Sequence, residues 1–204
     1  MSTSEIKAIL FDLGNVLIEI DFSRVISEWV RFSGKDDIQI SSDSILGSEN
    51  EKYERGEIST EQFVSSLKRE LKLNISDEEF LQGWNNIFVS ETPGIRNVID
   101  RVFSKYPLFV FSNTSISHSN VWRSQYSELL KYFDKIFTSY ELGMRKPEKE
   151  SFFKVCSDIG VTPENILFFD DTMENVVAAQ EMGMSSVQVN SINDISNHLD
   201  QIGV

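Results

Sequence analysis

The sequence predicts a doubly wound α/β fold, in which helices cover both faces of a parallel sheet and a group of helices is inserted after the first strand. Three observations predict it. Short apolar runs are typical of strands buried on both faces, helical patterns alternate with the later runs, and a long stretch of helical patterns interrupts that alternation. The 204 residues are enough for one domain with a smaller insertion, and 40% of them are hydrophobic.

Five short runs are predicted to form the strands of the sheet. The first, second and fourth runs are almost entirely apolar and are bounded by polar or turn residues, as buried parallel strands are. The runs cover residues 6–11, 108–112, 135–138, 166–169 and 186–189.

Helices are predicted between the later strands. The stretch 94–104 has apolar residues at helical spacing along one face. Pro147 is expected to begin a second helix that ends at Gly160, and a third helix is expected at 173–182, before Gly183.

Residues 22–92 break the alternation, because helical patterns follow one another there without a good strand. Two serines in this stretch are followed three residues later by Gln or Glu, which is the capping-box spacing at a helix start. We therefore expect a Rossmann-like core made of residues 1–21 and 93–204, and a helical cap made of residues 22–92.

The charge of the chain argues against two classes of partner. Its 19 Lys and Arg and 32 Asp and Glu give a formal net charge of −13, and no basic stretch offsets it. Nucleic-acid grooves and anionic membrane surfaces both favour such a stretch. The single cysteine, Cys156, cannot form an intramolecular disulfide, and the apolar stretch 6–20 carries charges that signal peptides and membrane helices lack. We expect a cytoplasmic protein with no nucleic-acid or membrane partner; its oligomeric state is left open.

Polar side chains follow three of the predicted strands, at the edge where an open parallel sheet binds its ligands. Asp12 follows the first strand, Ser112 and Asn113 end the second, and Asp170 and Asp171 follow the fourth. Two carboxylates about 4 Å apart repel each other by roughly 4 kcal/mol at an effective dielectric near 20. A divalent cation would offset this repulsion, and a set of oxygen ligands suits Mg²⁺, which keeps waters and phosphate oxygens as further ligands. The alternative is three helix-capping aspartates that gather by chance.

Lys146 precedes Pro147 at a predicted helix start, just past the third strand. A lysine at this point could neutralise both an aspartate and a phosphate oxygen. The alternative is a solvated surface charge.

Four segments resemble the signature motifs of the haloacid dehalogenase-like hydrolases, in the same order along the whole chain, and the inserted helices resemble the mobile cap of that superfamily. The segments are AILFDLGNVL (8–17), FVFSNT (109–114), GMRKPE (143–148) and ILFFDDTMEN (166–175). A closer resemblance is to the bacterial phosphatases that act on α-D-glucose 1-phosphate. It is carried by DLGNV (12–16), residues 20–22, ERGEIS (54–59), the SNT turn and LGMRKPE (142–148).

The resemblance implies a Mg²⁺-dependent phosphatase of small phosphorylated metabolites, sugar phosphates such as glucose 1-phosphate among them, that acts through an aspartyl-phosphate intermediate. It makes Asp12 the nucleophile and a metal ligand. It also implies that the metal binds the backbone carbonyl of Gly14 and the carboxylate of Asp171, with Asp170 as a ligand or an outer-shell partner.

The resemblance also implies a phosphate-binding set. Ser112 and the backbone of Asn113 would hold the phosphoryl oxygens, and Lys146 would pair with both Asp12 and the phosphate. A carboxylate that attacks a phosphate dianion meets repulsion, which Mg²⁺ and Lys146 would cancel.

Gly14 departs from the motif of most phosphatases in this superfamily, which have a second aspartate there to protonate the leaving group and later activate water. Such assistance is worth about 10²–10⁴-fold. The superfamily's dehalogenases and phosphonatases also lack this aspartate, so two alternatives stay open: a dehalogenase-type hydrolase, and a catalytically weak phosphate-binding or interaction domain. The pair Asp170 and Asp171 favours a phosphatase, because a dehalogenase needs no Mg²⁺. A sugar 1-phosphate also has a good leaving group, which lessens the need for an acid.

Other residues are candidates for the missing proton donor and for substrate choice. His118, in the loop expected after the second motif, could supply the proton; a solvated or helix-capping histidine is the alternative. The cap is expected to select the substrate. For the aromatic candidates the alternative is packing in the core, and for the arginine it is a surface salt bridge. The candidates are Tyr53, Glu54, Arg55, Gly56, Trp84 and Trp122.

Overall fold

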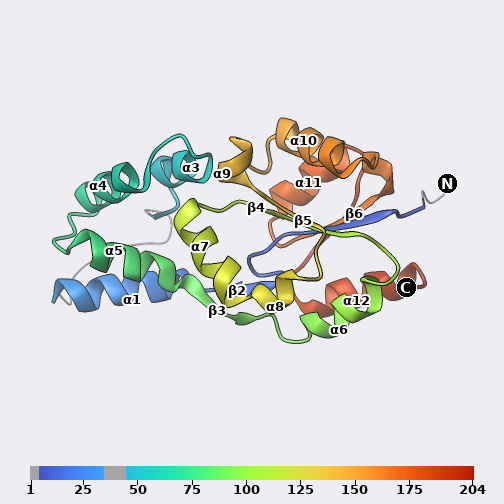
Figure 1. Ribbon diagram of the computed structural model, residues 1–204, viewed down its shortest axis with the longest axis horizontal. Coiled ribbons are helices and arrows are strands. Elements are labelled where there is room, and N and C mark those ends of the chain that lie inside the picture. The colour runs from blue at the N-terminus through green and yellow to red at the C-terminus, as the bar shows by residue number, and fades with distance from the viewer. Residues whose placement is uncertain (1–4, 35–44) are drawn as a thin grey trace.

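The structure is a computed structural model that describes residues 5–34 and 45–204. Its central sheet has five parallel strands in the order β5-β4-β1-β6-β7 (Figure 1). The chain thus builds outward from β1 to one side and then returns to build the other side. The strands are β1 (Ala8–Phe11), β4 (Leu108–Ser112), β5 (Lys135–Thr138), β6 (Ile166–Asp170) and β7 (Ser185–Gln188). The predicted doubly wound α/β fold is confirmed, and the strand order reverses beside β1.

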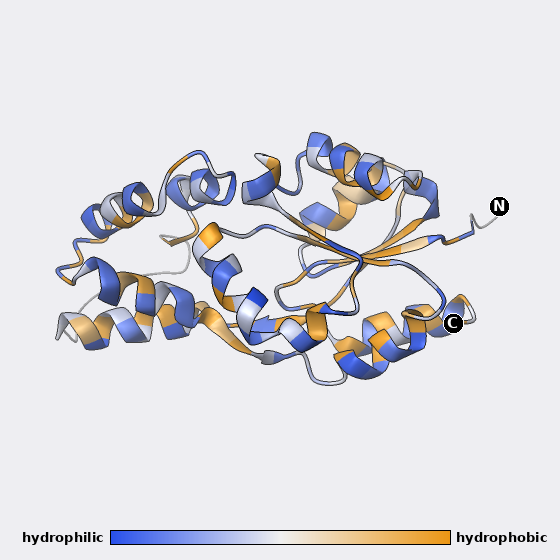
Figure 2. Cartoon of the chain, viewed as in Figure 1, coloured by the Kyte–Doolittle hydropathy of each residue, from blue (hydrophilic) through white to orange (hydrophobic). Residues whose placement is uncertain are grey.

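Helices cover both faces of this sheet because successive side chains of each buried strand point to opposite faces. Helices α10 and α11 pack on one face, and α6 and α12 pack on the other (Figure 1). Figure 2 shows the hydrophobic residues along the strands and on the helix sides that face them. These helices and their neighbours are α6 (Ile95–Val102), α7 (Ile116–Gln125), α8 (Ser127–Leu130), α9 (Ser139–Leu142), α10 (Lys149–Ile159), η2 (Pro163–Asn165), α11 (Met173–Glu181) and α12 (Ile192–Gln201).

A second group of helices lies at one end of the molecule, on the left in Figure 1. Both predicted capping boxes are present, at Ser59 with Gln62 and at Ser76 with Glu79. The group packs around buried aromatic rings, among which Trp29 stacks on Phe80 at 4.5 Å between ring centroids. The elements are α1 (Phe22–Ser33), α3 (Ser48–Glu54), α4 (Thr60–Glu70), α5 (Asp77–Trp84) and η1 (Asn85–Ile87).

The expectation that residues 22–92 contain no strand is wrong. The last α-helix of this stretch ends at Trp84, and β3 (Phe88–Glu91) pairs antiparallel with β2 (Ile18–Ile20). Four residues with a single buried side chain carry too little periodicity to separate a strand from a continuing helix. The stretch after β4 was also expected to be a loop and forms α7 instead, with Ser115 as its N-cap.

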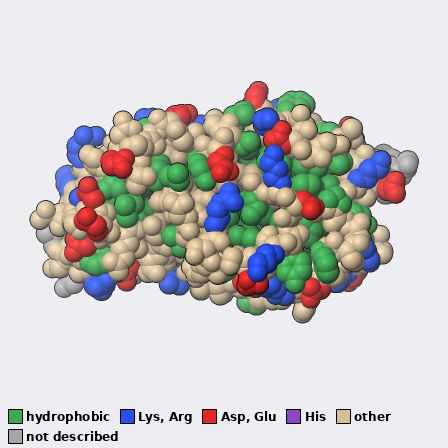
Figure 3. Space-filling view, in the orientation of Figure 1, with side chains coloured by type: hydrophobic (Ala, Val, Ile, Leu, Met, Phe, Trp, Pro, Cys, Tyr) green, Lys and Arg blue, Asp and Glu red, His purple; other side chains and the backbone are tan. Residues whose placement is uncertain are grey.

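The surface is mixed in charge. On the face shown in Figure 3, basic side chains lie among acidic and polar ones. Within the described residues, no helix has the length and apolar character that crossing a bilayer requires.

Gly83 in α5 is expected to be intolerant of a side chain. A Cβ at this position would lie 2.5 Å from Trp29 Cδ1, and Trp29 is held because it is fully buried and its Nε1 donates to the carbonyl of Phe80 at 2.9 Å. We expect Gly83→Ala to lower the free energy of unfolding by about 1–3 kcal/mol, although Ala favours a helix interior over Gly by about 1 kcal/mol. Urea denaturation measures this. Gln82→Ala, at an exposed position of the same helix, is the control, and equal stabilities of the two variants would contradict the packing argument.

Candidate active site

Three carboxylates meet at the carboxyl end of the central strands. Asp12 directly follows β1, Asp170 ends the neighbouring strand β6, and Asp171 comes next. One oxygen of each lies within 4.8 Å of one oxygen of the others. The backbone N–H of Asp12 donates to the carbonyl of Phe169 at 2.8 Å, which extends the pairing of the two strands to this point. We call these three residues the acidic cluster.

Lys146 reaches the acidic cluster from the segment that precedes α10. Its Nζ donates to Asp12 Oδ1 at 2.8 Å and to Asp170 Oδ2 at 2.6 Å, and its side chain is only 1% exposed. The ammonium also lies 5.2 Å and 5.5 Å from the ring centroids of Phe111 and Phe168. Burial alone would lower the pKa of Lys146, but the two carboxylates raise it above its usual value, so the lysine stays charged.

Asn113 has a role that the sequence did not reveal. Its side chain holds the backbone of Lys146 from both sides, because Asn113 Nδ2 donates to the Lys146 carbonyl and the Lys146 N–H donates to Asn113 Oδ1, each at 2.9 Å. The amide therefore fixes the position from which Lys146 enters the cluster. Ser112, the last residue of β4, is buried beside it.

Two further asparagines orient the carboxylates. Asn15 has a φ of 55°, a left-handed conformation that Asn tolerates, and its Nδ2 donates to Asp171 Oδ2 at 3.0 Å. Asn175 Nδ2 donates to both oxygens of Asp170, at 3.0 and 3.2 Å, and the backbone of Thr172 donates to the same carboxylate at 2.8 Å. Both asparagines stand inside the motif segments, which is the signal that could have identified them.

The donor set of the acidic cluster fits Mg²⁺. Three carboxylates face one ammonium, which leaves the cluster short of positive charge. Burial raises the pKa of Asp12 to about 7; Lys146 opposes this rise, whereas Asp170 and Asp171 add to it. Hard carboxylate oxygens are the ligands that Mg²⁺ prefers, and a divalent cation would supply the missing charge. Asp12 and Asp171 keep more free lone pairs than Asp170, whose oxygens already accept four hydrogen bonds.

A small cavity adjoins this position, and we call it the site cavity. It has a volume of about 140 Å³ and is lined from the sheet side by residues that include Gly14 and Ser112. From the helical group it is lined by residues that include Asn50, Glu54 and Trp84. Apolar side chains make up much of the remaining wall. Drug-sized ligands occupy pockets of about 300–1,000 Å³, so this cavity suits a small group.

His118 is neither solvated nor a helix cap. It lies in α7, is buried, stacks on Trp84 with 4.5 Å between ring centroids, and places Nε2 2.9 Å from the Trp84 carbonyl. A carbonyl only accepts, so Nε2 carries the proton. Burial lowers the pKa of His118 to about 4, which leaves a neutral imidazole at pH 7. This argues against the role of proton donor, although His118 lines the site cavity.

The other candidates for substrate choice differ in whether they line the site cavity. Trp84 and Trp122 line the site cavity and are buried, whereas Tyr53 is buried and stacks on Phe63. Arg55 forms the salt bridge that was its alternative, with Glu148 at 2.6 Å.

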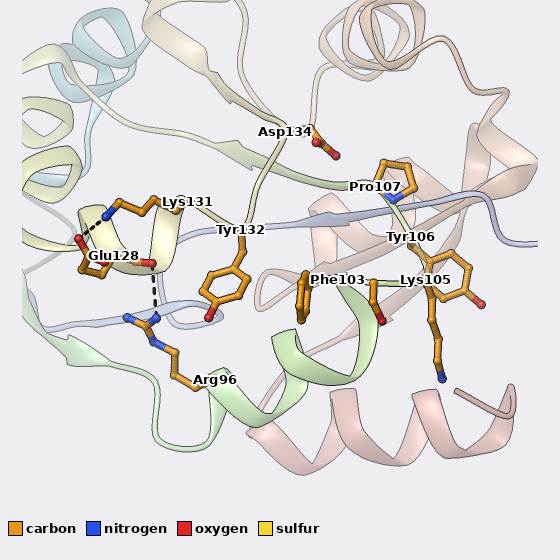
Figure 4. Close-up of a pocket in the computed structure, with 10 residues that line it drawn as sticks. Arg96, Phe103, Lys105, Tyr106, Pro107, Glu128, Lys131, Tyr132 and Asp134 are labelled. Atoms are coloured by element: carbon orange, nitrogen blue, oxygen red, sulfur yellow. Dashed lines mark hydrogen bonds and ion pairs between the residues drawn. The ribbon is translucent and has the colours of Figure 1, made fainter.

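A larger hollow of about 710 Å³ lies at the opposite, amino end of β4 and β5, away from the acidic cluster (Figure 4). Two of its basic side chains are engaged with protein partners. Arg96 donates to Glu91 at 2.6 Å and to the carbonyl of Glu128 at 3.4 Å, and Lys131 pairs with the Glu128 carboxylate. The cluster of three carboxylates that could hold a metal ion lies elsewhere, at Asp12, Asp170 and Asp171.

Asp12 gives the stability of the protein a pH dependence when no divalent cation is bound. Its pKa of about 7 exceeds the ordinary value of 3.8, so the folded state holds this proton more tightly than the unfolded state. The contribution of Asp12 to the free energy of unfolding is therefore most favourable below about pH 4 and falls as the pH rises to about 7. We expect Asp12→Asn to raise the melting temperature in EDTA at pH 8 and to change it little at pH 4. A difference independent of pH would contradict this.

The chain matches the family model of haloacid dehalogenase-like hydrolases over residues 6–183. It is 29% identical to the D-ribitol-5-phosphate phosphatase of Bacteroides thetaiotaomicron over 189 residues, which are 90% of this chain and 91% of that protein.

Solved structures agree. The fold is similar to the crystal structure of a haloacid dehalogenase family enzyme from Bacteroides thetaiotaomicron, with a TM-score of 0.84, 27% identity and coverage of 96% of this chain and 99% of that chain. The same enzyme in complex with magnesium and inorganic phosphate gives a TM-score of 0.82 at 29% identity, over 95% of this chain and 98% of that chain. The chain therefore belongs to the haloacid dehalogenase-like hydrolases.

Proposed function

We propose that this hydrolase is a Mg²⁺-dependent phosphatase of small phosphorylated polyols and sugars, glucose 1-phosphate among them. The observation that carries the proposal is the buried Lys146, whose ammonium bridges Asp12 and Asp170 next to Asp171. The similarity to a D-ribitol-5-phosphate phosphatase and to an enzyme that binds magnesium and phosphate supports it.

We also propose that the chain is organised into a catalytic core and a cap. Residues 1–21 and 93–204 would form the catalytic core, and residues 22–92 a cap that covers the site cavity. The contribution of Asn50, Glu54 and Trp84 to the cavity wall supports a cap that selects the substrate.

In the proposed site, the metal would be held by the carboxylates of Asp12 and Asp171 and by the backbone carbonyl of Gly14. When bound, Mg²⁺ supplies positive charge that draws electron density from the phosphoryl oxygens and lessens their repulsion of Asp12. Asp170 acts as an outer-shell partner, because its oxygens are engaged by Lys146, Thr172 and Asn175.

The proposed reaction uses these residues as follows. An Asp12 oxygen attacks phosphorus, the bond to the leaving oxygen breaks, and the leaving group takes a proton from solvent. Ser112 and the Asn113 backbone hold the phosphoryl oxygens, and Lys146 neutralises charge on Asp12 and on the phosphate as the bonds change. Water then attacks the aspartyl-phosphate, which releases inorganic phosphate and restores the Asp12 carboxylate.

The proposal is tested by hydrolysis of glucose 1-phosphate, D-ribitol 5-phosphate and p-nitrophenyl phosphate. We expect activity that EDTA abolishes and Mg²⁺ restores. Asp12→Asn should lower kcat by more than about 10³-fold, and Lys146→Ala by about 10²–10³-fold. Lys149→Ala is the matched control, since this lysine lies exposed and pairs with Glu181.

Two other results would overturn the proposal. Metal-independent release of halide from a 2-haloacid, without phosphatase activity, would identify a dehalogenase. Binding of phosphate without turnover of any of these substrates would identify a binding domain.

Gly14→Asp tests why the chain lacks the second aspartate. A Cβ at position 14 would lie 3.0 Å from Ile20 Cδ1, the far end of a flexible side chain, so Ile20 has to shift slightly to admit the acid. We expect it to raise kcat/KM for n-pentyl phosphate, whose leaving group is poor, by about 10-fold or more, and to raise it less for glucose 1-phosphate. Gly14→Asn is the control of equal size. Equal gains on both substrates, or the same gain with Asn, would contradict the explanation.

A further inference from the structure

Glu54, the last residue of α3, places a carboxylate at the wall of the site cavity. Its side chain is only 15% exposed, and it is held by Arg145, whose Nη2 and Nε lie 3.0 and 3.1 Å from Glu54 Oε2. Both contacts reach the same carboxylate oxygen, which leaves the other oxygen of Glu54 with acceptor capacity.

The position of Glu54 is tied to the catalytic segment. Arg145 directly precedes Lys146, and it also pairs with Glu51, one turn before Glu54, at 3.2 Å. The chain after α3 is pressed against α9, because a Cβ at Gly56 would lie 2.8 Å from the carbonyl oxygen of Tyr140. Glu54 is therefore fixed relative to the acidic cluster by contacts on both sides of the junction.

Two other polar groups share the same wall with Glu54. Asn50 is buried one turn earlier on α3 and lines the site cavity as Glu54 does. Trp84 is 1% exposed, and its Nε1 finds no hydrogen-bond partner in the part of the chain that the structure describes. A buried N–H without an acceptor is costly, and an oxygen of a ligand bound at this wall would satisfy it.

We infer that Glu54, with Asn50 and the indole N–H of Trp84, binds hydroxyl groups of the leaving group and so selects polyhydroxylated phosphate esters over plain alkyl esters. This inference rests on the proposed phosphatase function. A carboxylate accepts from a hydroxyl, an indole N–H donates to one, and the apolar wall contacts the carbon chain between them. A site built in this way discriminates strongly against an analogue without hydroxyls, because its buried polar groups are then left unpaired.

The experiment compares D-ribitol 5-phosphate with n-pentyl phosphate, which has the same carbon chain without the hydroxyls. We expect the wild type to prefer the ribitol ester, and Glu54→Gln to lower kcat/KM for that ester about 10- to 100-fold with little change for n-pentyl phosphate. The matched control is Glu51→Gln, which also removes a carboxylate from Arg145 but at a residue that is 44% exposed and does not line the cavity. It should keep the preference.

Binding provides a second readout that does not depend on turnover. In the Asp12→Asn background, titration calorimetry with Mg²⁺ should show tighter binding of D-ribitol 5-phosphate than of n-pentyl phosphate, and Glu54→Gln should remove most of the difference. If the wild type hydrolyses no ester but this binding preference is present, the proposed function fails and the assignment of Glu54 stands.

Two results would overturn the assignment. Equal losses for both esters in Glu54→Gln, matched by Glu51→Gln, would show that Glu54 only supports the fold around Arg145. A lower kcat/KM of Glu54→Gln for both D-ribitol 5-phosphate and n-pentyl phosphate, with unchanged hydrolysis of p-nitrophenyl phosphate, would instead make Glu54 the proton donor to poor leaving groups.

Discussion

The site depends on one electrostatic constraint. The adjacent parallel strands β1 and β6 bring the carboxylates of Asp12 and Asp170 close together in a buried position. The ammonium of Lys146 lies between Asp12 and Asp170 and makes that arrangement tolerable. Removing one partner of a buried ion pair lowers the stability of the fold far more than replacing the whole pair by apolar residues, because the remaining charge is left buried without a partner. The rest of the local structure serves to keep the lysine there. Phe111 and Phe168 flank its ammonium, and Asn113 fixes its backbone.

The segment that carries Lys146 also joins the two parts of the molecule. Arg145 forms ion pairs with Glu51 and Glu54 of α3, and Arg55, which directly follows α3, forms an ion pair with Glu148. Exposed ion pairs contribute little to stability one at a time, but this reciprocal set is partly buried and forms a network. Neighbouring residues of one short segment thus contact the acidic cluster and a wall of the site cavity.

The sequence was sufficient for the sheet and for the acidic cluster because both follow from local rules. Apolar runs mark the buried strands, and the carboxyl-end rule brings Asp12, Asp170 and Asp171 to one edge without any tertiary information. The same rules missed the roles of Asn113 and the burial of His118, because these depend on which segments meet across the fold. The short strand β3 was missed for the same reason, since its partner β2 lies about 70 residues earlier in the chain.

The closeness of Ile20 to the place that a side chain at position 14 would occupy implies an evolutionary constraint. A Cβ on residue 14 would touch the tip of the Ile20 side chain at 3.0 Å, so the volume that an acidic side chain would need is shared with a residue of β2. The two positions are then epistatic: a lineage that acquires an acid at the first gains most when the second becomes smaller. Among homologues, a glycine at the first should accompany a bulky aliphatic residue at the second, and the pair should covary rather than drift separately.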